Sequence, residues 1–333
     1  MIRAAVLNAG GWGTALSMVL SRRGHETSLW CRREEHAREI QSARENPRYL
    51  PGVKLGDRVR VTADLRTALM DADVVVFAPI SRGVRDLARA ASPYVPPEAL
   101  VVHGTKGLEV GSLLRVSQVI ESELGDSARR SVAALSGPTH AEEVGRGIPT
   151  ATVIACADTG VAEQLQRAFN CAELRVYTNA DVVGVELCGS LKNVVAIAAG
   201  ISDGIGGGDN AKAALMTRSL AEIGRLVVAA GGRAETVAGL AGIGDLVATC
   251  TSRHSRNRRA GELIGSGRPV AEVIQSTPQV VEGIPATQAA VRLAARLGVE
   301  MPIAGQLHAI LFEEKPPRQA IAELMGREPT AER

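Results

Sequence analysis

The feature that most constrains the fold is an alternation of short apolar runs with amphipathic stretches, from the N-terminus to about Thr178. Several runs lack polar residues over four or more positions, which is typical of strands buried on both faces of a sheet. Strand, helix and strand in alternation predict a parallel sheet with right-handed crossovers. The predicted strands are Ile2–Leu7, Glu26–Trp30, Val59–Thr62, Asp73–Ala78, Leu100–Gly104, Val132–Ser136, Ala151–Cys156 and Leu174–Tyr177.

From Asp181 onward the sequence changes to long helical patterns separated by glycine-rich turns. The predicted helices are Asp181–Ala199, Ala211–Ala230, Arg258–Ile264 and Thr287–Leu297. We therefore expect two domains. Residues 1–179 would form a doubly wound α/β, Rossmann-like dinucleotide-binding domain, and residues 180–333 an all-helical substrate and catalytic domain.

Composition excludes several classes of protein. Hydrophobic residues make up 45% and charged residues 22% of the chain, as in an ordinary globular protein. The 38 Lys and Arg residues nearly balance 36 Asp and Glu residues, which argues against a nucleic-acid partner. Five scattered cysteines form neither a disulfide framework nor a metal motif. We expect a cytoplasmic protein without signal peptide, membrane insertion or metal, and the sequence leaves a homodimer open.

The first predicted strand runs into a glycine loop that opens a helix. Gly10 and Gly13 match two of the three glycines of a GxGxxG fingerprint, in the strand–loop–helix context that the fingerprint requires. Gly10 would let the backbone approach a pyrophosphate, and Gly13 would let the helix pack against the strand. Asn8 replaces the first glycine, and asparagine tolerates the positive φ that a tight turn there demands. Glycines serving only packing are the alternative, but the context favours dinucleotide binding.

The end of the second predicted strand bears on cofactor choice. A carboxylate for the ribose 2′-hydroxyl is expected here, yet the chain reads Arg32-Arg33, and the first acid is Glu34. Two guanidinium groups suit a 2′-phosphate. The alternative is a solvated start of a helix. We predict that NADP is used and that NAD is also accepted.

Two of the few lysines lie in apolar surroundings. Lys106 follows the strand Leu100–Gly104, and Lys192 lies inside the apolar helix Asp181–Ala199. Burial lowers the pKa of a lysine and prepares it for proton transfer near neutral pH. A lysine reaching out from a helix edge is the alternative. The surroundings favour an acid/base role for Lys192.

Seven motifs in order, which cover almost the whole chain, resemble those of bacterial NAD(P)-dependent glycerol-3-phosphate dehydrogenase. They are Gly10-Gly11-Trp12-Gly13-Thr14-Ala15-Leu16, Thr105-Lys106-Gly107-Leu108, Ser136-Gly137-Pro138-Thr139-His140-Ala141, Leu191-Lys192-Asn193-Val194, Gly242-Ile243-Gly244-Asp245-Leu246, Ser255-Arg256-Asn257-Arg258 and Val280-Val281-Glu282-Gly283. The resemblance implies hydride transfer between a nicotinamide and C2 of dihydroxyacetone phosphate, with sn-glycerol 3-phosphate supplied to phospholipid synthesis.

The resemblance also assigns roles to residues. Lys192 would be the general acid/base. Substrate would be held by Lys106, Gly137, Thr139, Lys192, Asp245, Ser255, Arg256 and Asn257. The cofactor would be lined by Gly10, Gly11, Trp12, Gly13, Arg32, Arg33, Ala141, Arg256, Val280 and Glu282, with Lys106 and Tyr49 beside it.

Other functions remain as alternatives at this point. Another two-domain NAD(P)-dependent dehydrogenase, of the β-hydroxyacid type, would share the architecture and a lysine on a helix. A nucleotide-binding protein without catalysis would be expected to have lost Lys192 or the substrate loop, and both are present. The basic run Arg253–Arg259 lacks the interleaved aromatic residues of an RNA-binding patch, and we expect Arg258 and Arg259 in part on a solvated face.

Overall fold

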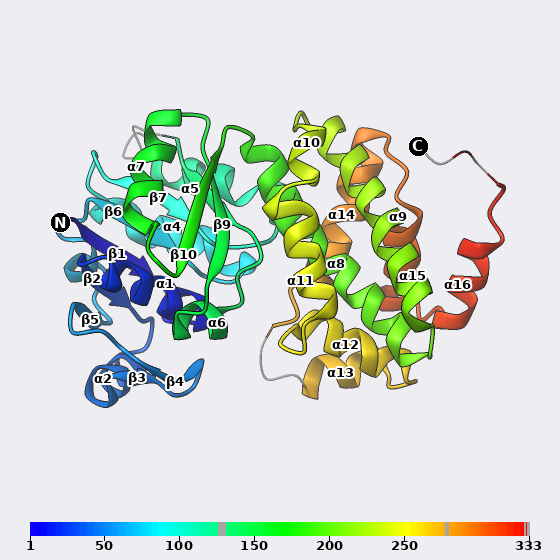
Figure 1. The fold of residues 1–333 in the computed structure, drawn as a ribbon, viewed down its shortest axis with the longest axis horizontal. Coiled ribbons are helices and arrows are strands. Elements are labelled where there is room, and N and C mark those ends of the chain that lie inside the picture. The colour runs from blue at the N-terminus through cyan, green and yellow to red at the C-terminus, as the bar shows by residue number, and fades with distance from the viewer. Residues whose placement is uncertain (126–130, 277–279, 330, 332–333) are drawn as a thin grey trace. The chain divides into compact units, whose positions relative to one another are not determined.

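The computed structural model describes residues 1–125, 131–276, 280–329 and 331 (Figure 1). It divides into two compact units. The first comprises Met1–Lys106 and Leu114–Val182, and the second comprises Gly107–Leu113 and Val183–Arg333.

The first unit is built on an eight-stranded sheet with the order β10-β9-β8-β7-β6-β1-β2-β5. All eight predicted strands are confirmed, with ends that differ by at most two residues. Their bounds are β1 (Arg3–Leu7), β2 (Glu26–Trp30), β5 (Val59–Thr62), β6 (Val74–Phe77), β7 (Leu100–His103), β8 (Ala133–Ser136), β9 (Thr150–Ala155) and β10 (Leu174–Asn179).

One strand pair departs from the expected parallel sheet. β8 and β9 are antiparallel, with Ala134 opposite Ala155, whereas the other neighbouring pairs are parallel. The connection holds only the six-residue helix α6 (Ala141–Arg146). Such a helix spans about 9 Å at 1.5 Å per residue, less than half the length of the six-residue β9, about 20 Å at 3.3 Å per residue. The chain therefore turns back instead of crossing over.

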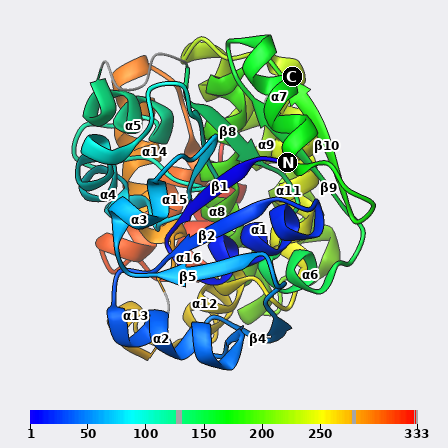
Figure 2. The same ribbon diagram turned by 90° about the vertical axis from the view of Figure 1, so that its left-hand side faces the viewer.

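Both faces of the sheet are covered, which explains the polar-free strands. Along β1, Ala4 and Val6 face one core cluster, and Ala5 and Leu7 face the other. The first cluster contains residues of α1 (Gly11–Arg22), α2 (Glu34–Ala43), α6 and α7 (Thr159–Phe169), and the second contains residues of α3 (Leu65–Leu69), α4 (Val84–Ala91) and α5 (Val116–Leu124) (Figure 2). Short 3₁₀ turns lie at Ser81–Gly83 and Ser92–Tyr94.

A small hairpin between α2 and β5 has no counterpart in the sequence prediction. It pairs β3 (Glu45–Asn46) with β4 (Leu50–Lys54) in antiparallel register. β3 has only two residues, and β4 contains Pro51 and Gly52, so neither shows the apolar pattern from which strands are predicted.

From Val182 on, the described residues form helices joined by turns, as predicted. The helices are α8 (Val182–Gly204), α9 (Gly208–Ala229), α10 (Ala234–Val237), α11 (Asp245–Thr251), α12 (Arg256–Gly265), α13 (Val270–Ser276), α14 (Gly283–Leu297), α15 (Pro302–Phe312) and α16 (Pro317–Met325), with a π turn at Leu240–Gly244. By length and composition, α8 could cross a membrane. However, 83% of its most apolar window is buried inside the protein, as befits the core helix of the second unit (Figure 1).

Glycines let α8 and α12 approach closely. A Cβ on Gly200 of α8 would lie 2.0 Å from the carbonyl oxygen of Arg258. A Cβ on Gly261 of α12 would lie 2.0 Å from the carbonyl oxygen of Ile197. No side chain fits at either position, so the two backbones pack directly on each other. This crossing brings the start of α12 beside the middle of α8, where Lys192 and Asn193 lie.

Candidate active site

The loop between β1 and α1 has the geometry of a phosphate-binding turn. Asn8 has φ of 99°, which confirms the predicted positive φ, and its Nδ2 donates to the Ala78 carbonyl at 3.0 Å. A Cβ on Gly13 would lie 2.1 Å from the Asn8 carbonyl oxygen, so only glycine fits there. The first N–H groups of α1 therefore lie close to the carboxyl end of β1. They form a cradle that fits a dinucleotide pyrophosphate.

We expect Asn8→Val to weaken NADPH binding by about tenfold or more, because a β-branched residue resists positive φ at a cost of about 1–3 kcal/mol. The variant also loses the bond to Ala78. Asn8→Gly, which accepts this φ freely, should bind NADPH within about threefold of the original chain. Fluorescence titration of NADPH measures both dissociation constants. An Asn8→Val protein that binds as tightly as Asn8→Gly would contradict the argument.

Four further residues of the predicted cofactor set lie around this loop. The position of a Cβ on Gly11 is 2.7 Å from the Tyr49 carbonyl oxygen and 3.7 Å from Cβ of Ala141. The Trp12 indole packs against Gly104, which follows β7. The structure therefore brings Gly11, Trp12, Tyr49 and Ala141 together at the carboxyl edge of the sheet, where such folds bind ligands.

Arg32 and Arg33 follow β2, and Arg33 precedes the first turn of α2. Both side chains are exposed. Among the described residues, neither guanidinium group has an ion pair or hydrogen bond, so both are available to an anion. Their contact with a 2′-phosphate stays a prediction.

A lysine and a hydroxyl meet at the loops after β7 and β8. Lys106 Nζ donates to the Gly137 carbonyl at 2.8 Å and to Thr139 Oγ1 at 3.3 Å. Gly137 has φ of 138°, a conformation that favours glycine. The structure thus brings together the three residues of this unit that the resemblance placed on the substrate.

Lys192 lies in the middle of α8 and is 7% exposed. Its Nζ donates to Asp245 Oδ1 at 2.6 Å and to Thr249 Oγ1 at 2.6 Å. Asp245 is 2% exposed. Burial penalises the charged forms of both groups, whereas the short ion pair favours them. The prediction that Lys192 is buried is confirmed, the structure places Asp245 beside its amine, and the alternative of a lysine reaching out from the helix edge is wrong.

Sequence reasoning missed Thr249. It lies one helical turn after Asp245 on α11, and its Oγ1 donates to Asp245 Oδ1 at 3.3 Å. The spacing of four residues places both side chains on one face of the helix. The spacing is visible in the sequence, but it points to a functional pair only once Lys192 is seen to contact both side chains.

The Ser255–Asn257 motif begins α12. Ser255 caps the helix by accepting from the Arg258 N–H at 3.2 Å. Asn257 is buried, donates to Asn193 Oδ1 at 2.9 Å and accepts from the Gly283 N–H at 2.9 Å. Asn257 thereby joins α8, α12 and α14, a structural role that the sequence did not indicate.

Arg256 is exposed, and its Nη1 donates to the Val280 carbonyl at 3.4 Å. Val280 and Glu282 lie just before α14, so these three residues of the predicted cofactor set are neighbours. Their contact with a cofactor stays a prediction. Arg259 is exposed, as expected of a solvated face, whereas Arg258 is half-buried and forms an ion pair with Asp203 at 2.7 Å; Lys212 pairs with the same carboxylate at 2.6 Å.

Comparisons with known proteins identify the family. The model of the NAD-dependent glycerol-3-phosphate dehydrogenase N-terminus matches residues 3–162, and the model of its C-terminus matches residues 181–322. The chain belongs to this family. The glycerol-3-phosphate dehydrogenase [NAD(P)+] of Pelotomaculum thermopropionicum is 51% identical over 99% of this chain and 95% of its own length. That of Bacillus subtilis is 45% identical over 100% and 96%.

Solved structures agree with this glycerol-3-phosphate dehydrogenase fold. The crystal structure of the Coxiella burnetii enzyme superposes with a TM-score of 0.92 at 41% identity, covering 98% of this chain and 99% of that chain. A ketopantoate reductase from Ralstonia eutropha reaches a TM-score of 0.59 at 19% identity, a likeness in fold alone. The family match therefore argues against the alternative of a β-hydroxyacid dehydrogenase.

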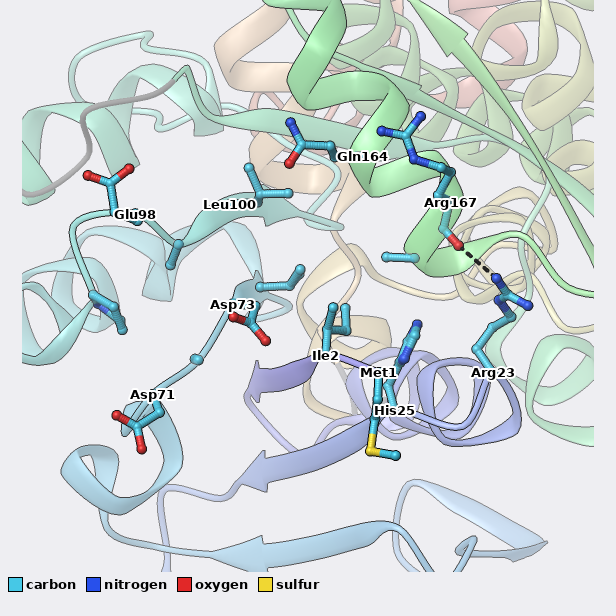
Figure 3. A pocket seen from close by; sticks show the side chains of 15 residues that line it. Met1, Ile2, Arg23, His25, Asp71, Asp73, Glu98, Leu100, Gln164 and Arg167 are labelled. Atoms are coloured by element: carbon cyan, nitrogen blue, oxygen red, sulfur yellow. Dashed lines mark hydrogen bonds between the residues drawn. The ribbon is translucent and has the colours of Figure 1, made fainter.

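The dehydrogenase fold also has a hollow of about 810 Å³ at the opposite edge of the sheet (Figure 3). Residues that precede the strands line it, among them Met1, His25 and Asp73, with Arg23 and Arg167 at one side. Because the strands around it are parallel, their amino ends meet here, away from the glycine loop. The hollow therefore contributes nothing to the cofactor cradle.

Proposed function

We propose that this chain interconverts dihydroxyacetone phosphate and sn-glycerol 3-phosphate with NADPH or NADH. The observation that carries the proposal is the buried Lys192, which is bonded to Asp245 and Thr249 in a chain of this family. A nicotinamide, when bound, supplies or accepts the hydride at C2. The glycine loop and the start of α1 would hold the pyrophosphate of that cofactor.

The ammonium group of Lys192 acts at the C2 oxygen. Arrival of hydride at C2 places negative charge on that oxygen, and an ammonium beside it stabilises the charge and donates a proton. The product hydroxyl and the neutral lysine balance the step. In the reverse direction, the neutral lysine accepts the hydroxyl proton as hydride leaves C2. Asp245 and Thr249 orient the amine, and the carboxylate favours its charged form.

The other residues that the resemblance assigns to the site complete the proposal. Lys106, Gly137, Thr139, Asp245, Ser255, Arg256 and Asn257 would hold the substrate, and Arg256, Val280 and Glu282 would also line the cofactor. Cations suit the phosphate of the substrate, and Lys106 and Arg256 supply them. Cys250 takes no part as a nucleophile, because burial raises the pKa of its thiol to about 12.

Steady-state assays test the function directly. Dihydroxyacetone phosphate is offered with NADPH and with NADH, and a 3-oxo acid, whose reduction gives a β-hydroxy acid, is offered as the substrate of the rival dehydrogenase. We expect turnover of the phosphorylated ketone with both cofactors and none of the oxo acid. Turnover of the oxo acid alone would support the β-hydroxyacid type, and cofactor binding without any turnover would support a binding protein.

Replacing Arg32 and Arg33 by serine tests cofactor choice. We expect NADPH binding to weaken by about 1.5–3 kcal/mol, the usual contribution of a hydrogen bond to a charged group, and NADH binding to change little. The ratio of the two dissociation constants, measured by fluorescence titration, gives the answer. Equal weakening of both cofactors would refute a 2′-phosphate contact.

The setting of the enzyme is part of the same proposal. A cytoplasmic location and supply of glycerol 3-phosphate to phospholipid synthesis follow from the family's usual role. Burial of α8 supports an enzyme without membrane insertion. Light scattering tests the homodimer, with an expected mass twice that of one chain.

A further inference from the structure

One buried asparagine is bonded to the glycine loop from outside it. Asn46 lies in the β3–β4 hairpin and is 0% exposed. Its Nδ2 donates to the Ala9 carbonyl at 2.9 Å and to Thr14 Oγ1 at 2.8 Å. Thr14 Oγ1 in turn donates to the Gly10 carbonyl at 2.8 Å. One hydrogen of the amide thus bonds the Ala9 carbonyl directly, and the other bonds the Thr14 hydroxyl that donates to the Gly10 carbonyl.

The oxygen of this amide belongs to a series of hydrogen bonds that runs through His36 to Cys31. Asn46 Oδ1 accepts from the Tyr49 N–H at 3.3 Å and lies 3.3 Å from His36 Nε2. With the amide in this orientation, a neutral imidazole of His36 donates from Nε2 to Asn46 Oδ1 and accepts at Nδ1. Cys31 Sγ lies 3.2 Å from Nδ1, so the thiol donates. Burial raises the pKa of the Cys31 thiol, which keeps it protonated for this bond.

The network joins the two cofactor-facing segments of the first unit. Ala9, Gly10 and Thr14 belong to the loop and helix after β1, and Cys31 follows β2 directly, next to Arg32. All of the polar side chains in the network are buried. A fully satisfied buried network is rigid, and removing one member leaves its partners without hydrogen bonds.

We infer that Asn46 and His36 are positioning residues for the dinucleotide. Asn46 holds the Ala9 and Gly10 carbonyls away from the phosphates, so that the N–H groups at the start of α1 face them. His36 keeps the Asn46 amide in the one orientation that does this, and links it to the segment that carries Arg32 and Arg33. This inference rests on the proposed function for the identity of the ligand.

The role predicts a pattern that differs from that of the arginine pair. Asn46→Ala should weaken NADPH and NADH alike by about tenfold or more, since the pyrophosphate is common to both. The KM for dihydroxyacetone phosphate should stay within about twofold of that of the original chain. Titration of NADPH fluorescence without substrate gives a dissociation constant that does not depend on turnover.

Two further sets of variants separate positioning from stability. Thr14→Val removes the hydroxyl with little change of shape and should also weaken both cofactors, whereas Thr14→Ser should restore binding to within about threefold. Asn170→Ala is the matched control: Asn170 Oδ1 accepts from the Val176 N–H at 3.0 Å in the same unit, near the amino end of β10. It should lower the melting temperature and leave cofactor affinity unchanged.

The outcomes are distinct. Thr14→Val binding NADPH as tightly as Thr14→Ser would overturn the inference, as would a folded Asn46→Ala protein with unchanged affinity. A loss of affinity in Asn170→Ala equal to that in Asn46→Ala would show a general effect of stability and would also overturn it. If the original chain binds NADPH but does not reduce dihydroxyacetone phosphate, the proposed function fails, while the binding comparison still decides the role of Asn46.

Discussion

Replacing Lys192 by methionine is expected to lower kcat for reduction of dihydroxyacetone phosphate by about 100-fold or more. Methionine has a similar length and fills the apolar site, but it can neither stabilise the charge on the C2 oxygen nor donate a proton. The dissociation constant for NADPH should stay within about twofold, because the cradle for the cofactor pyrophosphate lies in the first unit. Steady-state kinetics and fluorescence titration provide the two measurements.

Lys315→Met is the matched control for this variant. Lys315 lies in the same unit and pairs with Glu323 at 2.7 Å, but the proposal gives it no part in the reaction. Its replacement should leave kcat unchanged. If the Lys192→Met protein keeps more than a tenth of the original kcat, the activation barrier has risen by less than about 1.4 kcal/mol. Lys192 is then not the general acid/base.

Replacing Asp245 by alanine is expected to have the largest effect on stability. The change removes the anionic partner of a lysine that is only 7% exposed. Breaking a buried ion pair in this way costs about 3–5 kcal/mol, because the remaining charge is buried without compensation. Urea denaturation measures the free energy of unfolding, and kcat should fall as well because the amine loses its orientation.

The double variant Lys192→Met, Asp245→Leu isolates the cause. It removes both charges and replaces them with apolar side chains of comparable volume, an exchange that is often neutral or stabilising. We expect most of the stability to return while activity stays absent. A double variant as unstable as Asp245→Ala would show that packing around Asp245, and not the uncompensated charge, accounts for the loss.

The sequence by itself determined the layers of the first unit and the location of its cofactor loop. Strands buried on both faces need apolar residues at every position, so a short apolar run such as Val74–Phe77 is enough to predict one. Gly13 could be read in the same way, because the close contact it permits is made within six residues of the chain. The seven motifs likewise indicated the family from the sequence alone.

Only the tertiary structure decided which distant residues meet. The partners of Lys192 come from α11, 53 and 57 positions away, and Asn46 reaches the glycine loop from a hairpin 37 positions along the chain. The antiparallel β8–β9 pair depended on the length of α6, which no period in the strands records. Hydrophobic periodicity reports which face of an element is buried, whereas hydrogen bonds between elements depend on the packing that follows.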